Sequence, residues 1–348
     1  MAFPKRDQLT TEMEKCFRCN TDFICTWVPW TWKTVIAFHK YKDLKQQWLN
    51  VKFICFNRLL NNYLTELWWS YWDDILTIDS WFWKMKAKTK LSKQYPTYFL
   101  ETDNAWIKHV FTEYINILWK KFDRIVIDEW QDLWINFYRN SHILADNVAV
   151  FMDDHQKLKW TSILIWDTET QLYEASWRTP HRFTLTRIFR SPKKVYEFAK
   201  AFIPHDLVAN DPSLLKNITD NPKSDLKCFD NTVSKVEKIK EILDSDYNVW
   251  KSIWIFWPDR REIGSLKTEF CNKYGKERES RMANYNPGNP EWFSRNWKIL
   301  LSNFDCAKWL EFDTVILLAP SLNNDDLAAN KLYTLCTRSK ENLYVFMK

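Results

Sequence analysis

Glycine is almost missing from this chain, which has 3 glycines in 348 residues. Average usage is about 7%, so roughly 24 glycines are expected for this length. The sequence also lacks a secretory leader and an apolar run long enough to cross a bilayer, and we therefore expect a cytoplasmic protein without a membrane partner. Its hydrophobic content of 46% is enough for ordinary cores, and its length suits two domains.

Cysteine and net charge restrict the function only weakly. The eight cysteines are scattered, and Cys16-Phe-Arg-Cys19 is a single C-x-x-C pair with no second pair to complete a zinc site. We therefore expect reduced thiols and no zinc. The net charge of +6 is compatible with a nucleic-acid partner, but many proteins without one are equally basic.

Tryptophan is as abundant as glycine is scarce. The 22 tryptophans and 3 glycines make 25 residues together, which is close to the number expected for glycine alone. Some bacterial lineages read the codon UGA as glycine, whereas other codes read it as tryptophan. We hypothesise that most of these tryptophans stand where glycine belongs, and UGG codons at 27, 30 and 32 would contradict this.

Residues 22–38 contain the strongest local pattern. An apolar run from Phe23 to Cys25 leads into a loop that ends in Lys33-Thr34, and a helical apolar pattern follows. The strand-loop-helix order, the spacing and the Lys-Thr pair match the phosphate-binding pattern G-x-x-x-x-G-K-[ST]. Such a loop surrounds phosphates with backbone N–H groups, and its glycines leave room for them. We expect nucleotide contacts from the following residues, although tryptophan occupies the glycine positions: Trp27, Pro29, Trp30, Thr31, Trp32, Lys33 and Thr34.

A second pattern follows the predicted strand 122–128, which ends in two adjacent carboxylates, Asp128 and Glu129. Mg²⁺ bound with phosphates takes one or two carboxylates, so we assign Asp128 and the Thr34 hydroxyl to the metal. Hydrolysis also needs a group that positions and deprotonates water, and we assign Glu129 to it. Gln131 is expected near the nucleotide. The next predicted strand, 148–152, leads to Gln156, which is expected to sense the γ-phosphate.

Together with three later segments, these patterns resemble the UvrD/Rep-like branch of superfamily 1 helicases, and in particular its short members. Residues 185–192 resemble the fourth motif, in which Arg190 would contact the γ-phosphate and Phe189 would stack on the base. Residues 299–313 resemble the fifth motif, with Trp309 in place of glycine, and the resemblance implies that Glu311 contacts the ribose.

Residues 332–344 resemble the sixth motif of the same family, whose arginine reaches the γ-phosphate as a finger; Arg338 occupies that position. The resemblance implies an α/β fold of two RecA-like P-loop NTPase domains, each a mostly parallel sheet flanked by helices. We place the domains at 1–183 and 184–348, with a small insertion at 81–120. That insertion is basic and aromatic, so it either lies near nucleic acid or forms a solvated helical hairpin.

The implied function is that of a monomeric DNA helicase or translocase that uses ATP and Mg²⁺ to move along single-stranded DNA, or RNA. One alternative is a catalytically impaired nucleic-acid-binding protein that retains the helicase fold, because the loop tryptophans argue against nucleotide binding. A third interpretation is a nucleotide kinase or signalling ATPase, and the arginine motifs at Arg190 and Arg338 argue against it.

Overall fold

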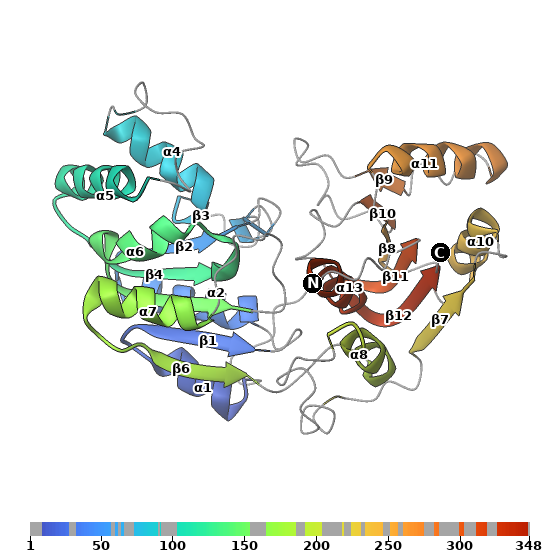
Figure 1. Cartoon of the computed structure of the whole chain (residues 1–348), viewed down its shortest axis with the longest axis horizontal. Coiled ribbons are helices and arrows are strands. Elements are labelled where there is room, and N and C mark those ends of the chain that lie inside the picture. Colours follow the sequence, from blue (N-terminus) through green and yellow to red (C-terminus); the bar gives the residue numbers. More distant parts are fainter. Residues whose placement is uncertain are drawn as a thin grey trace. The chain divides into compact units, whose positions relative to one another are not determined.

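The computed structural model divides the chain into two compact units, Met1–Thr186 and Arg187–Lys348. Figure 1 shows the helices and strands of each. The residues whose structure is described are 9–27, 33–56, 60–61, 64–65, 73–89, 91, 103–153, 165–185, 192–203, 218, 224–230, 234–245, 251–256, 260–274, 282–284, 299–302, 311–318 and 326–346.

The first unit contains a six-stranded sheet in the order β3-β2-β4-β5-β1-β6, and each of its described pairings is parallel. Its strands are β1 (Phe23–Trp27), β2 (Val51–Cys55), β3 (Ile75–Thr77), β4 (Phe122–Asp128), β5 (Ala145–Met152) and β6 (His181–Leu185). Its helices are α1 (Thr11–Arg18), α2 (Lys33–Gln46), α4 (Ile78–Lys88), α5 (Asn104–Leu118), the short η5 (Trp130–Asp132), α6 (Ile135–Leu144) and α7 (Ile165–Ser176).

Both faces of this sheet are covered, which explains why its central strands are apolar along their whole length. On one face, the rings of Phe38 and Tyr41 from α2 pack against Phe53 of β2. On the other face, a larger core joins the strands to α4, α5, α6 and α7, and Trp81 contributes to it with 1% of its surface exposed. Because alternate residues of a strand point to opposite faces, Phe53 and Ile54 serve the two cores separately.

The amino ends of the strands are joined by polar side chains that accept backbone N–H groups from the neighbouring strand. Asp22, just before β1, accepts from Val148 of β5 at 2.7 Å, and Asp123 of β4 accepts from Asn50 at 2.7 Å. In the second unit, Asp313 of β11 accepts from Ser252 at 2.8 Å. These bonds satisfy amides that the parallel ladder leaves at its edge and thereby help to set the register.

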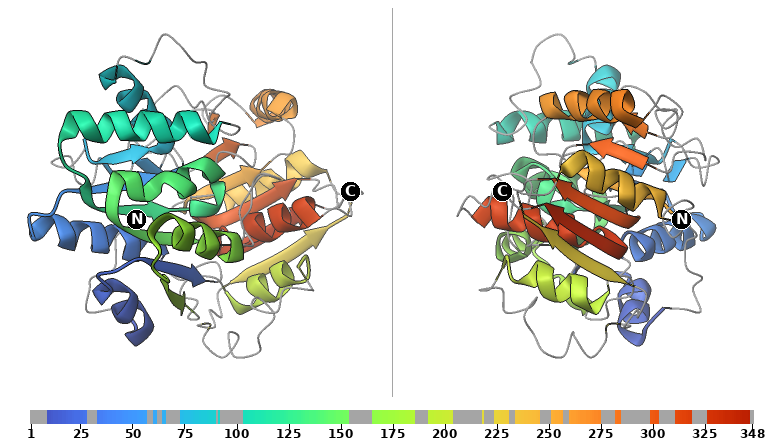
Figure 2. Two further views of the ribbon diagram at one scale, coloured as in Figure 1. Left: turned by 60° about the vertical axis from the view of Figure 1, so that its left-hand side comes forward. Right: turned by 90° about the vertical axis from the view of Figure 1, so that its right-hand side faces the viewer.

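The second unit repeats the architecture with a sheet in the order β7-β12-β11-β8-β10-β9, whose described pairings are also parallel. Its strands are β7 (Asp225–Phe229), β8 (Ile253–Phe256), β9 (Met282–Asn284), β10 (Ile299–Ser302), β11 (Phe312–Leu318) and β12 (Ser339–Phe346). Its helices are α8 (Lys193–Lys200), α10 (Lys235–Asp244), α11 (Arg260–Tyr274) and α13 (Asp326–Cys336). Figure 2 shows helices on both faces of this sheet.

The predicted α/β class with two mostly parallel, helix-flanked sheets is confirmed. The predicted boundary after residue 183 falls inside β6, which continues to Leu185 as a strand of the first sheet. The segment 81–120 contains most of α4 and all of α5, and both helices bury aromatic residues in the core of the first unit. The alternative of a solvated hairpin therefore does not describe these helices, since hydrophobic burial holds them in the core of the first unit.

Candidate nucleotide site

The candidate residues of the first unit lie at the carboxyl ends of its parallel strands. Lys33 is the first residue of α2, which follows β1, and Asp128 is the last residue of β4. In open parallel sheets, ligands bind outside this edge, near the strand where the connections change direction. The connection from β1 runs to β2 on one side of β1, whereas the connection from β5 runs to β6 on the other side of β1. The direction of the connections therefore changes at β1.

Four of the predicted residues are in contact: Lys33, Thr34, Asp128 and Glu129. The Thr34 hydroxyl donates to the Asp128 carboxylate at 2.7 Å. The Lys33 ammonium forms an ion pair with Glu129, and it lies 3.9 Å from Oδ1 of Asp128. Asp128 and Glu129 are 0% and 1% exposed, and Lys33 is 9% exposed. A buried carboxylate requires a compensating charge, and Lys33 supplies it here.

Glu129 also has an unusual backbone, with φ 60° and ψ 49° in the left-handed region. Left-handed backbone costs an L residue roughly 1–2 kcal/mol, and such residues cluster at functional sites. The side chain of Gln131 donates to the Glu129 carboxylate, while its oxygen accepts the backbone N–H of Asp153 at 3.1 Å. Gln131 thus connects the carboxylate after β4 to the end of β5.

Two buried thiols lie near Asp128. Burial raises the pKa of Cys25 well above its usual value, helped by a hydrogen bond with Cys16 and opposed by the charge of Lys33. Burial also raises the pKa of Cys55, and the negative charge of Asp128 adds to the effect. Both thiols therefore stay protonated at neutral pH and add no charge to the pair of carboxylates.

Trp130, between Glu129 and Gln131, is fully buried. Its ring stacks on Tyr138 with the centroids 4.0 Å apart, and its Nε1 donates to the Thr168 hydroxyl at 3.0 Å. The hypothesis that most tryptophans of this chain stand where glycine belongs also covers Trp130, which lies between two predicted site residues. Its packed environment sets it apart from the exposed tryptophans described below, so it has to be tested separately.

The donor set suits a magnesium ion that is bound together with phosphates. The Thr34 hydroxyl and the Asp128 carboxylate are adjacent oxygen ligands of the kind that Mg²⁺ prefers. Mg²⁺ needs few protein ligands when phosphates and water complete its octahedron. Among the described residues, no group of three or more His, Cys, Asp and Glu side chains forms a closed metal site.

In the second unit, Glu311 and Arg338 come to the same edge of the sheet, at the amino ends of β11 and β12. The backbone N–H of Phe312 donates to the carbonyl of Arg338 at 3.0 Å, and Phe312 lies opposite Ser339 in the parallel register. The Arg338 side chain is 8% exposed, and its Nε donates to the carbonyl of Thr334 at 3.1 Å in the last turn of α13.

Several predicted site residues lie outside the described residues. They are Pro29, Trp30, Thr31, Trp32, Gln156, Phe189 and Arg190, together with the side chain of Trp27, whose backbone ends β1. Trp309 lies outside them as well. Their roles stay predictions.

Asp153 is a residue that we did not assign to the site. It follows β5 directly, is fully buried, and donates its backbone N–H to the side-chain oxygen of Gln131. Its position directly after an apolar strand could have indicated a site residue, but in this segment we assigned only Gln156, three residues later, to the nucleotide.

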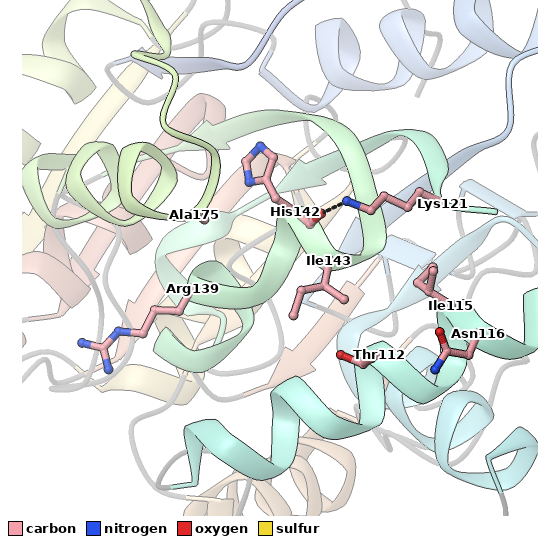
Figure 3. Close-up of a pocket in the computed structure, with 8 residues that line it drawn as sticks. All are labelled: Thr112, Ile115, Asn116, Lys121, Arg139, His142, Ile143 and Ala175. Atoms are coloured by element: carbon pink, nitrogen blue, oxygen red, sulfur yellow. Dashed lines mark hydrogen bonds between the residues drawn. The ribbon is translucent and has the colours of Figure 1, made fainter. Parts of the chain in front are cut away.

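A pocket of about 430 Å³ lies elsewhere on the first unit and is shown in Figure 3. It is lined by residues of α5, α6 and α7 and by Lys121, which precedes β4 and is therefore at the amino end of the strands. Its polar groups already have structural partners: Lys121 donates to the carbonyl of His142 at 2.8 Å, and Arg139 donates to Gln171 at 2.9 Å. This pocket is separate from the Lys33–Glu129 pair.

No helix within the described part of the chain has the length and apolar character needed to span a membrane. No protein-family model matches the chain, and no curated protein is significantly similar to it. One solved structure that matches is the C-terminal domain of a possible DNA helicase from Lactobacillus plantarum WCFS1, with 17% sequence identity and a TM-score of 0.31. The match covers 46% of this chain and 86% of that one. A similarity at this level carries no functional weight, so any function has to be argued from the residues of this chain.

Proposed function

We propose that this protein is an ATP-driven helicase or translocase of the UvrD/Rep-like superfamily 1 type, built from two RecA-like domains. The observation that carries the proposal is the contact of Lys33 and Thr34 with Glu129 and Asp128 at the carboxyl ends of β1 and β4. Lys33 and Thr34 end the phosphate-binding pattern, and Asp128 and Glu129 are the adjacent carboxylates at the end of the predicted strand 122–128. The two pairs are far apart in the sequence. Two motifs that meet in space support one site better than either motif does alone.

In this proposal, Lys33 moves from the Glu129 carboxylate to the phosphates of ATP when the nucleotide binds. Glu129 then accepts a proton from the attacking water, held in place by the amide of Gln131. Thr34 and Asp128 hold Mg²⁺, which neutralises phosphate charge when it is bound with the nucleotide. Gln156 senses the γ-phosphate.

The second unit contributes Arg190 and Arg338, which stabilise the charge that develops on the transferred phosphoryl group. Glu311 contacts the ribose and Phe189 the base. An arginine that reaches the nucleotide from the other domain couples domain closure to hydrolysis, and repeated closure moves the protein along a single strand. Contacts to phosphates and stacking on aromatic rings make that binding independent of sequence.

The tryptophans at 27, 30 and 32 favour one second candidate. A protein with these side chains in the loop would be a catalytically impaired nucleic-acid-binding protein that keeps the fold. Loop glycines permit left-handed backbone and close approach of phosphates, and a tryptophan side chain prevents both.

ATP hydrolysis in the presence and absence of single-stranded DNA distinguishes the two candidates. It is measured on the chain as printed and on a loop-substituted protein that carries Trp27→Gly, Trp30→Gly, Trp32→Gly and Trp309→Gly. We expect DNA-stimulated hydrolysis from the loop-substituted protein and little from the printed chain. Because Trp130 is buried, the substituted protein is made with and without Trp130→Gly.

Lys33→Ala in the loop-substituted protein is the control, and it should abolish hydrolysis. Circular dichroism checks that this variant is folded, because Lys33 also compensates the buried carboxylates. If every loop-substituted version is folded, as shown by circular dichroism, and none hydrolyses ATP, the non-enzymatic candidate is correct.

A further inference from the structure

Tryptophan accounts for three of the four non-glycine residues with positive φ in the described part of the chain. They are Trp48, Trp119 and Trp177, with φ values of 62°, 58° and 56°. The fourth is Glu129 of the candidate site. Tryptophan supplies 22 of 348 residues, so this concentration is far above its share of the chain. A bulky side chain in the left-handed region is a genuine outlier, whereas glycine adopts it without cost.

All three residues follow the last turn of a helix. After α2, the N–H of Trp48 donates to the carbonyl of Lys45 at 3.0 Å, and the N–H of Leu49 donates to that of Leu44 at 3.2 Å. These two bonds form the Schellman motif, in which the left-handed residue is usually glycine. After α5 and α7, Trp119 and Trp177 each donate to the carbonyl four residues back, which is the related left-handed helix ending.

The side chains of these residues contribute little to the fold. Trp48, Trp119 and Trp177 are 95%, 92% and 78% exposed, and the ring of Trp177 makes an edge contact with Tyr173. Trp81 in α4 is the opposite case, with 1% exposure and rings of Phe122 and Phe137 around it. Ordinary tryptophans bury their large apolar surface, and the three at helix ends do not.

We infer that positions 48, 119 and 177 are glycine in the protein as its own cell makes it, because the gene's UGA codons are read there as glycine. This inference depends on backbone conformation and exposure alone, and it is independent of the proposed ATPase activity. It also supports the same reading at 27, 30 and 32, where the phosphate-binding pattern requires glycine.

The codons provide the direct test. We expect UGA at positions 48, 119 and 177 and UGG at position 81, and UGG at any of the first three would overturn the inference. Peptide mass spectrometry on the protein isolated from its own cells should show glycine at the three positions, and tryptophan there would overturn it equally.

Thermal unfolding provides the physical test, with no nucleotide present. Trp48→Gly, Trp119→Gly and Trp177→Gly should each raise the melting temperature of the first unit by about 2–4 °C, because each removes left-handed strain. Alanine at the same positions is the matched control: it also removes the exposed ring but keeps the strain, so it should give a smaller rise than glycine. Equal effects of glycine and alanine would overturn the inference. Trp81→Gly should lower the melting temperature, since it leaves a cavity in the core and a flexible residue inside a helix.

Discussion

The carboxyl edge of the first sheet and the amino edge of the second differ in charge. In the first unit, the carboxylates of Asp128 and Glu129 at the end of β4 face the single ammonium of Lys33 at the start of α2, so this group of three is acidic. In the second unit, Glu311 and Arg338 lie where β11 and β12 begin, and Arg338 is held against its own helix. The comparison suggests a division of labour in the proposed ATPase: one edge binds metal and activates water, and the other supplies a cation.

The largest effect is expected from removing that cation. Arg338→Ala in the loop-substituted protein should lower kcat about 10³-fold or more, because an arginine finger stabilises charge in the transition state. Arg338→Lys keeps a charge but loses the planar guanidinium, so it should rescue little. Single-turnover hydrolysis measures both variants. Full activity of Arg338→Ala would contradict the proposal that the amino edge of the second sheet supplies a cation for hydrolysis.

A smaller loss of kcat is expected from a change at the carboxyl edge of the first sheet. Glu129→Gln should lower kcat by about 10²–10⁴-fold, because the amide cannot accept the proton of the attacking water. Binding of a fluorescent ATP analogue should persist, since Lys33 and Thr34 are unchanged. If binding is lost together with hydrolysis, Glu129 organises the pocket instead of acting as the base.

The free energy of unfolding tests the role of the Gln131 side chain, which connects the end of β4 to the end of β5. Gln131→Met should reduce the free energy of unfolding by about 1–3 kcal/mol, since it leaves the buried Glu129 carboxylate and the Asp153 N–H without this partner. Gln47→Met is the matched control, because Gln47 bonds Asp43 on the surface of α2. It should change stability by less than about 0.5 kcal/mol. Equal effects in urea unfolding would contradict a structural role for Gln131.

The smallest effect compares the amino edges of the two sheets. Burial raises the pKa of Asp22, but its hydrogen bond and charge interaction with His142, the Val148 N–H and the charge of Arg178 together hold it below the usual value. The pKa of Asp313 is also lowered, because Lys340 and Ser252 outweigh its burial. A lowered folded pKa stabilises the protein above the unfolded value of about 4, and this contribution is lost as pH falls below it.

Asp22→Asn should therefore cost roughly 1 kcal/mol at pH 7 and less at pH 4, with a smaller cost for Asp313→Asn because its side chain is 23% exposed, against 2% for Asp22. Urea unfolding at the two pH values measures the difference. A cost for Asp22→Asn that does not fall with pH would show that shape, and not charge, sets the contribution of this carboxylate.

Much of the fold follows from local patterns in the sequence. The apolar runs at 122–128 and 148–152 are strands, and the Lys33-Thr34 pair does begin a helix. The role of 81–120 was harder to predict, because a basic and aromatic segment looks exposed until its partners are known. Trp81 lies in the core because its ring packs against Phe122 of β4, and Trp106 because its ring packs against Phe82 of α4. Such packing depends on contacts distant in sequence.

The sequence by itself determined the alternation of strands and helices, the order of the candidate motifs and the imbalance between glycine and tryptophan, because these depend on neighbouring residues and on counts. Only the tertiary structure decided that Lys33 pairs with Glu129, that Gln131 connects Glu129 to β5, and which tryptophans are buried and which end helices in the left-handed region. Side chains from separate strands meet only when the sheet has formed, and a backbone angle shows its strain only in a folded chain.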